Sequence, residues 1–328
     1  MIDMRESITA KLCAFARAYH SNYAQPKIFD DYLAFDLMGR ETYEEMGQLV
    51  EHDFDLSKVY EDQSFDSKVV FSLLDRYLTP IPLSRTAFAE DALLRFAEQK
   101  GSCQYVICGA GMDTFAFRNT NPSIRIFELD HPDTQRYKLE QIKALEWNQP
   151  ENLSYVPIDF SKTKMSTVLE QAGFDRNLPT FFSLLGVTYY LKLSVFEQTL
   201  REMSSLSGVP SQLVFDFPDK NGFSESAQDT LRYHRMTQTE RTAAGLARLR
   251  EGRQRSRRLA QITSKLGEEM QQGFSSSEIE QALSRNDFKI LCHKTPEQIQ
   301  KTFFEGRTDG QTAFETVHFI LAETKRRQ

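Results

Sequence analysis

The chain has 328 residues and a formal net charge of -6, so overall electrostatics do not favour a nucleic-acid partner bound through its phosphates. Apolar residues make up 40% and charged residues 26% of it, which is typical of a soluble protein with one large α/β domain or two modest ones. The four cysteines form no C-x-x-C pair, and neither a signal peptide nor a membrane span is recognisable, so we expect a cytoplasmic protein with no metal and no membrane partner.

The first part of the chain, residues 1–84, has helical periodicity and no strong strand pattern. Prolines then interrupt the sequence at positions 80 and 82. Ser84 is a plausible N-cap for a helix over residues 85–100, which Gly101 would end. We therefore expect an N-terminal helical lid (1–84) that packs over the open edge of a larger domain (85–328).

Apolar strand-like segments and helical segments alternate in that larger domain. Strands are expected at 104–108, 125–130, 153–158, 179–185 and 213–217, with helices at 134–147 and 168–172 and another capped by Ser194. A polar, arginine-rich stretch, residues 220–272, then predicts an inserted helical cap. Helices at 277–286 and 296–304 and strands at 288–293 and 316–322 complete the chain.

This alternation predicts parallel βαβ units with right-handed crossovers. The fold class is therefore α/β: a doubly wound, mostly parallel, seven-stranded Rossmann-like sheet with an antiparallel last strand. In such a sheet, ligands bind outside the carboxyl ends of the strands, where the strand order reverses.

The strongest motif follows the first expected strand, in the run Cys-Gly-Ala-Gly-Met-Asp-Thr. Gly109 and Gly111 let the backbone pass close to a ligand, and Asp130 ends the next strand, where its carboxylate can accept hydrogen bonds from a ribose. A dinucleotide fingerprint needs a third small residue beneath the pyrophosphate, but Asp113 would repel that group. The motif therefore favours a cationic cofactor such as S-adenosyl-L-methionine.

Three segments carry a family resemblance: CGAGMDTFAFR, FELDHPDTQRYK and PTFFSLLGVTYYL, in that order. With them the chain resembles the leucine carboxyl methyltransferase-like family of class I S-adenosylmethionine-dependent methyltransferases. Within this family it is most similar to the polyketide-type bacterial O-methyltransferases. The resemblance covers residues 80–217 well and residues 220–272 poorly. It implies methyl transfer from S-adenosyl-L-methionine, with S-adenosyl-L-homocysteine as product.

The resemblance also assigns roles to single residues. It places Arg85 at the carboxylate of the methionine moiety, the two glycines beside that moiety, and Arg118 in support of the glycine turn. Asp130 would bind the ribose, and Asp159 with Phe160 would lie at the adenine. Asp159 is equally able to cap the following helix. The predicted cofactor-binding set is Arg85, Gly109, Gly111, Asp113, Asp130, His131, Asp159, Phe160 and Leu185.

His131 is expected to shape the adenosine pocket or to cap the strand rather than to act in catalysis. Leu185 stands where family members that methylate protein carboxyl groups have a glutamate. This departure favours a small-molecule acceptor over a protein C-terminal carboxylate.

Candidate catalytic residues lie where an acceptor would approach the methyl group. Tyr189 and Tyr190 follow the fourth expected strand, although aromatic packing is an alternative role. His234, in the inserted cap, is a candidate general base or an ordinary surface residue. The arginines from Arg248 to Arg258 form either a solvated helical face or a docking patch for an acyl or peptidyl carrier protein.

The sequence does not choose between a carboxylate and a hydroxyl as the acceptor oxygen. A carboxylate is already charged at neutral pH, whereas a phenol, with a pKa of about 10, benefits from a base. Two further classes also remain open: an NAD(P)-dependent oxidoreductase, which Asp113 argues against, and a protein that binds the cofactor without catalysis.

Overall fold

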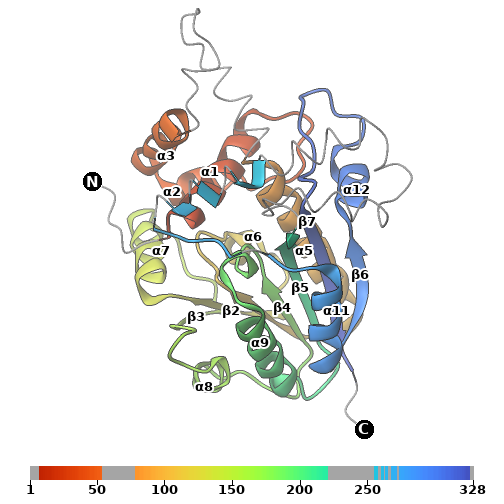
Figure 1. Ribbon diagram of the computed structural model, residues 1–328. Coiled ribbons are helices and arrows are strands. Elements are labelled where there is room, and N and C mark those ends of the chain that lie inside the picture. Colours follow the sequence, from red (N-terminus) through yellow and green to blue (C-terminus); the bar gives the residue numbers. More distant parts are fainter. Residues whose placement is uncertain are drawn as a thin grey trace, which may run out of the picture.

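A seven-stranded sheet forms the centre of the computed structural model, which describes residues 7–53, 78–220, 255–257, 260–261, 263–264, 267–271 and 273–325 (Figure 1). The strands are β1 (Cys103–Cys108), β2 (Ile124–Asp130), β3 (Leu153–Pro157), β4 (Thr180–Leu184), β5 (Gln212–Pro218), β6 (Phe288–Lys294) and β7 (Val317–Thr324). Their order is β3-β2-β1-β4-β5-β7-β6. The first five are mutually parallel, and β7 runs antiparallel to both β5 and β6. The predicted fold class is confirmed.

Helices cover both faces of the sheet, as a doubly wound fold requires. One apolar cluster joins the strands to α8 (Met165–Gln171), α9 (Leu193–Leu206) and α11 (Ser276–Arg285). On the other face, a second cluster includes α5 (Pro80–Lys100), α6 (Phe115–Arg118), α12 (Pro296–Ile299) and the π turn η5 (Gln300–Phe304). Figure 1 shows α9 and α11 in front of the strands and α5 behind them. Another helix, α7 (Pro132–Ala144), packs beside β3.

The N-terminal helices form a third apolar cluster above the strand ends. It contains α1 (Ile8–Tyr23), α2 (Ala34–Met38) and α3 (Arg40–Asp53), together with Met112 and Ile142 from the sheet domain. In Figure 1 these helices, in red and orange, lie above the sheet. The division into an N-terminal lid and a larger domain stays a prediction.

The start of α5 differs from the sequence prediction. The helix begins at Pro80, and Ser84 lies buried inside it, with its hydroxyl donating to the carbonyl of Pro80. Proline lacks an N–H, but the first helical turn leaves its N–H groups unpaired in any case, so prolines can begin a helix instead of interrupting the chain. The expected boundary at residue 84/85 therefore cuts through α5. Ser194 is likewise the second residue of α9, and Lys192 occupies the cap position.

The strand order reverses beside β1, which lies between β2 and β4. The carboxyl ends of these three strands therefore flank the crevice where open α/β sheets bind ligands. Within the described ranges, no helix combines the length and the apolar character that crossing a membrane would require.

One buried histidine links α1 to the segment that follows it. The ring of His20 is fully buried, and its Nε2 atom accepts the backbone N–H of Ile28 at 2.8 Å. Burial, with a smaller contribution from the charge of Arg307, lowers the pKa of His20 from 6.5 to about 4. The folded protein therefore holds this ring neutral, whereas the unfolded chain takes up a proton below pH 6.5.

We predict that the free energy of unfolding falls as the pH drops from about 6.5 to about 4, because only the unfolded chain binds this proton. At about 1.4 kcal/mol per pKa unit, wild type should lose about 3 kcal/mol more than His20→Gln between pH 7 and pH 4. Urea unfolding at several pH values measures the free energy of unfolding of wild type and of His20→Gln. Parallel pH profiles for the two proteins would contradict this account.

Candidate functional site

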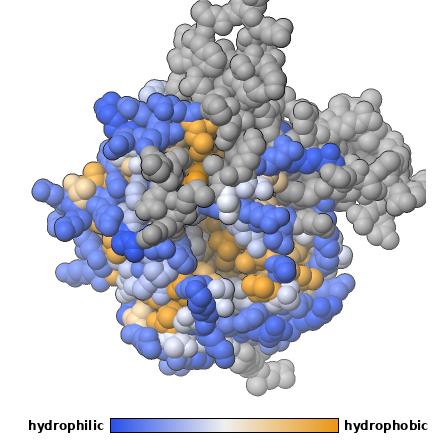
Figure 2. Space-filling view, turned by 60° about the vertical axis from the view of Figure 1, so that its left-hand side comes forward, coloured by the Kyte–Doolittle hydropathy of each residue, from blue (hydrophilic) through white to orange (hydrophobic). Residues whose placement is uncertain are grey.

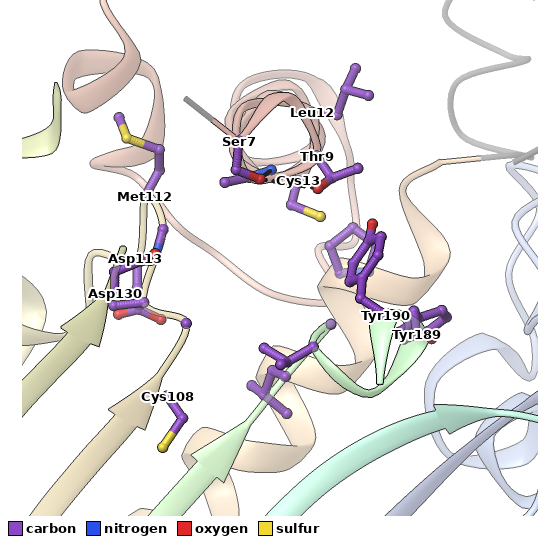
Figure 3. Close-up of a pocket in the computed structure, with 18 of the residues that line it drawn as sticks. Ser7, Thr9, Leu12, Cys13, Cys108, Met112, Asp113, Asp130, Tyr189 and Tyr190 are labelled. Atoms are coloured by element: carbon purple, nitrogen blue, oxygen red, sulfur yellow. Dashed lines mark hydrogen bonds between the residues drawn. The ribbon is translucent and has the colours of Figure 1, made fainter. Parts of the chain in front are cut away.

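A cavity of about 420 Å³ lies at the carboxyl ends of β1, β2 and β4, beneath α1 (Figure 3). The face shown in Figure 2 is hollowed, with apolar residues gathered in the hollow and hydrophilic residues around it. Eight of the nine predicted cofactor residues line the cavity: Arg85, Gly109, Gly111, Asp113, Asp130, His131, Phe160 and Leu185. The ninth, Asp159, does not. Among the described residues, no group of three His, Cys, Asp or Glu side chains could hold a metal ion.

The glycine turn fits both the cavity and the lid. Gly109 and Gly111 have φ values of 77° and 51°, in the left-handed region that favours glycine. A Cβ atom on Gly109 would lie 2.7 Å from Cγ2 of Val187, and one on Gly111 would lie 3.0 Å from Cβ of Ala10. Glycine is therefore needed for space as well as for backbone conformation, because α1 and the segment after β4 both approach the turn closely.

Asp130 lies at the end of β2, beside the turn. One of its carboxylate oxygens accepts the N–H of Gly111, and the other accepts the N–H of His131 at 2.6 Å. Burial raises the pKa of Asp130, and these two backbone hydrogen bonds oppose the rise. A carboxylate has about four acceptor positions, so two remain for hydroxyl groups in the cavity. His131 caps α7 through its Nδ1 atom, which accepts the N–H of Asp133 at 3.3 Å, so it caps a helix and not the strand.

The remaining acidic residues near the turn have local partners. Asp113 lines the cavity, and its carboxylate accepts the N–H of Phe115 at 2.7 Å, at the start of α6. Asp159 pairs with Lys162 at 2.7 Å and accepts the N–H of Ser161 at 3.0 Å, and these contacts lower its pKa. The structure thus brings Phe160 to the cavity and leaves Asp159 in a surface turn. A role for Asp159 at an adenine stays a prediction.

Asp216, on β5, is a site residue that the sequence reasoning missed. Its carboxylate is fully buried and accepts from Arg85 Nη1 at 3.2 Å, from the N–H of Gly186 at 2.7 Å and from the hydroxyl of Tyr189 at 2.9 Å. Gly186 was missed as well: its φ is 71°, and a Cβ atom there would lie 2.6 Å from Nη2 of Arg85. The available signal was an aspartate inside the otherwise apolar run Leu-Val-Phe-Asp-Phe.

The two predicted tyrosines lie in the 3-10 turn η2 (Thr188–Tyr190) and differ in their roles. Burial raises the pKa of Tyr189 far above 10, and its phenol donates to Asp216, so Tyr189 supports Arg85 and its neighbours. Tyr190 lines the cavity, and its hydroxyl hydrogen-bonds with Thr9 of α1. His234, the third predicted catalytic residue, lies outside the described residues.

A buried ionic network attaches the lid to the turn. Arg17 of α1 pairs with Asp31 at 2.8 Å and donates to the carbonyl of Met112 at 2.7 Å. Arg118 lies 3.4 Å from Asp31 and pairs with Glu90 of α5 at 3.0 Å. Arg118 therefore supports the segment after the glycine turn, whereas the resemblance had assigned it to the turn itself, and the same network positions α1 over the cavity.

The arginine run is only partly a surface feature. The structure describes two of its arginines, Arg255 and Arg257; the others, Arg248, Arg250, Arg253 and Arg258, lie outside the described residues. Arg255 is buried, 4.0 Å from the ring centre of Phe314 and 3.6 Å from the carboxylate of Glu315. Arg255 is therefore a core residue and does not belong to a docking patch. Arg257 is exposed.

The family model and the related sequences that match this chain all describe methyltransferases. Residues 10–204 match the family model described as leucine carboxyl methyltransferase. A Bacillus subtilis protein with the provisional name S-adenosyl-L-methionine-dependent methyltransferase YktD is 34% identical over 324 residues, which cover 97% of this chain and 98% of the relative. A similarly named protein from Parafrankia is 32% identical over 149 residues, 45% of this chain and 47% of the relative.

The fold also matches a solved structure. A protein from Thermobifida fusca, provisionally described as a methyltransferase, superimposes with a TM-score of 0.53 and 15% identity, and the match covers 94% of each chain. At this identity the match supports the fold alone.

We predict that the Asp216 contacts contribute unequally to stability. Asp216→Asn removes the charge that balances Arg85, whose side chain is 12% exposed, and should cost about 3 kcal/mol, because a largely buried charge without its partner is costly. Tyr189→Phe removes one hydrogen bond and should cost about 1 kcal/mol. Urea unfolding at pH 7.5 measures both variants. Equal costs would contradict the assignment of Asp216 as the counter-ion of Arg85.

Proposed function

This chain belongs to the leucine carboxyl methyltransferase family and is an S-adenosylmethionine-dependent methyltransferase, and we propose that it methylates an oxygen atom of a small molecule. The observation that carries the proposal is the cavity, which gathers the glycine turn, Asp130, Arg85 and the segment after β4 beneath one helix. Each of these parts offers a contact that the cofactor needs.

The residues present fit S-adenosyl-L-methionine. Asp130 has two acceptor positions left for the ribose hydroxyls, and Phe160, a 43% exposed aromatic residue of the cavity, offers a ring face for adenine. Gly109 and Val187 line the cavity beside the turn, where we place the methionine moiety. Arg85 lies at the β4 side, where we place the methionine carboxylate.

When bound, the cofactor supplies a methyl group on a sulfonium, which an acceptor oxygen takes by in-line displacement. The protein must then orient the acceptor and exclude water. Helix α1 excludes water, because Thr9, Leu12 and Cys13 line the cavity from above (Figure 3). Asp216 helps to orient the acceptor indirectly, since it fixes Arg85, Gly186 and Tyr189 beside the place where the acceptor enters.

Leu185 supports a small molecule over a protein C-terminus as acceptor. It lines the cavity at the end of β4, where the protein-methylating members that the chain resembles have a glutamate. The lid also crosses the cavity, which favours a compact acceptor. Because Arg255 is buried, a carrier protein as partner rests on the exposed Arg257 and on arginines outside the described residues.

The other candidate functions are weaker. An NAD(P)-dependent oxidoreductase would place a pyrophosphate at the turn, where Asp113 adds a negative charge. A protein that only binds the cofactor would show S-adenosylhomocysteine binding but no methyl transfer to any acceptor.

We predict that calorimetry detects binding of S-adenosylhomocysteine and S-adenosylmethionine and none of NAD. Asp130→Asn should weaken S-adenosylhomocysteine binding by about 1 to 3 kcal/mol, because it removes charge-assisted hydrogen bonds. Asp91→Asn, on the exposed face of α5, is the matched control and should bind like wild type. A preference for NAD, or equal affinities in all three proteins, would refute the cofactor site.

A further inference from the structure

The part of the cavity away from Asp130 is built by three separate segments. In Figure 3, Asp113 and Asp130 lie on one side, Tyr189 and Tyr190 on the other, and Thr9 of α1 above them. The third segment is 267–271, which adds Glu268 and Met270 to the cavity wall. We call the part of the cavity formed by Thr9, Tyr190, Glu268 and Met270 the acceptor end.

Glu268 has a defined position in this wall. Its N–H donates to the carbonyl of Thr263 at 2.8 Å, and the N–H of Gln271 donates to the carbonyl of Tyr189 at 2.7 Å. Its carboxylate accepts the hydroxyl of Thr9 and, at 3.4 Å, the N–H of Thr9. Two of about four acceptor positions on the carboxylate are therefore left for another donor.

Because of the other charges around the cavity, the carboxylate of Glu268 determines which kind of acceptor can bind. Among the described residues, two arginines line the cavity, Arg17 and Arg85, and each is paired with a buried aspartate, Asp31 or Asp216. Arg85 is in addition the residue that we place at the methionine carboxylate, so neither arginine is a further counter-ion for an acceptor carboxylate. A second carboxylate brought beside Glu268 would be repelled, because like charges in a partly desolvated cavity are poorly screened.

We propose that Glu268 selects an uncharged hydroxyl acceptor and excludes a carboxylate, by accepting a hydrogen bond from the acceptor hydroxyl. The ring of Tyr190 and the side chain of Met270 form apolar wall beside it, which suits an aromatic or otherwise apolar alcohol. This inference rests on the proposed function and goes further, because it chooses between the two kinds of oxygen that methyl transfer allows.

Glu268 also has a structural role, and the two roles can be separated. Its bonds to Thr9 hold the start of α1 over the cavity. Thr9→Val removes the hydroxyl contact and leaves the carboxylate in place. Glu268→Gln removes the charge and keeps an oxygen that can accept from Thr9. Only the second change should alter the selection of the acceptor.

The test uses the protein saturated with S-adenosylhomocysteine and two probes with the same ring, phenol and benzoate, whose binding is measured by ligand-observed NMR. Wild type should bind phenol at least tenfold more tightly than benzoate. Glu268→Gln should bring this ratio close to one. Thr9→Val should keep the preference, as should Glu269→Gln, which removes a charge from the exposed neighbouring residue.

Benzoate binding as tightly as phenol in wild type would overturn the proposal, and so would an unchanged ratio in Glu268→Gln. A ratio lost equally in Thr9→Val would reduce Glu268 to an anchor for α1, and no binding of either probe would show that the acceptor end takes no such ligand. Each of these outcomes is interpreted only for a protein that has been shown to bind S-adenosylhomocysteine. A protein that fails to bind it would instead refute the proposed function.

Discussion

The site depends on one buried carboxylate, that of Asp216. It stands on β5, an inner strand of the sheet, and three donors from two segments converge on it: Arg85 from α5, and the N–H of Gly186 and the phenol of Tyr189 from the segment after β4. A charge in a protein core is tolerated only with a partner and satisfied hydrogen bonds. Because Arg85 supplies the charge and the segment after β4 supplies the other donors, satisfying Asp216 also fixes that wall of the cavity.

A second constraint is the close approach of the lid. Helix α1 lies so near the glycine turn that a Cβ atom at position 111 would lie 3.0 Å from Cβ of Ala10, and the ionic network through Asp31 holds the helix there. The cavity is therefore assembled from parts far apart in the sequence, and only some of them belong to the α/β core. Under the proposed function, the strand ends supply the cofactor contacts, and α1 and the segment 267–271 complete the acceptor end.

The sequence predicted the features whose cause is local. The alternation of apolar and helical segments predicted the sheet, and the spacing from Gly109 to Asp130 predicted residues that line the same cavity. The sequence did not predict the contacts between distant segments: Arg85 and Asp216 are 131 positions apart, and Thr9 and Glu268 are 259 apart. No periodicity encodes such pairs, because they depend on how the elements pack. The predicted start of α5 was wrong for a local reason, since two prolines can begin a helix as well as interrupt a chain.

The most direct test of the account is a crystal structure of the protein with S-adenosylhomocysteine. The account predicts the ribose hydroxyls on the carboxylate of Asp130, the adenine against Phe160 and the sulfur directed toward Tyr190 at the acceptor end. A ligand in the reverse orientation, with its adenine beside Tyr190 and Glu268, would contradict the account, and so would a ligand bound outside the cavity.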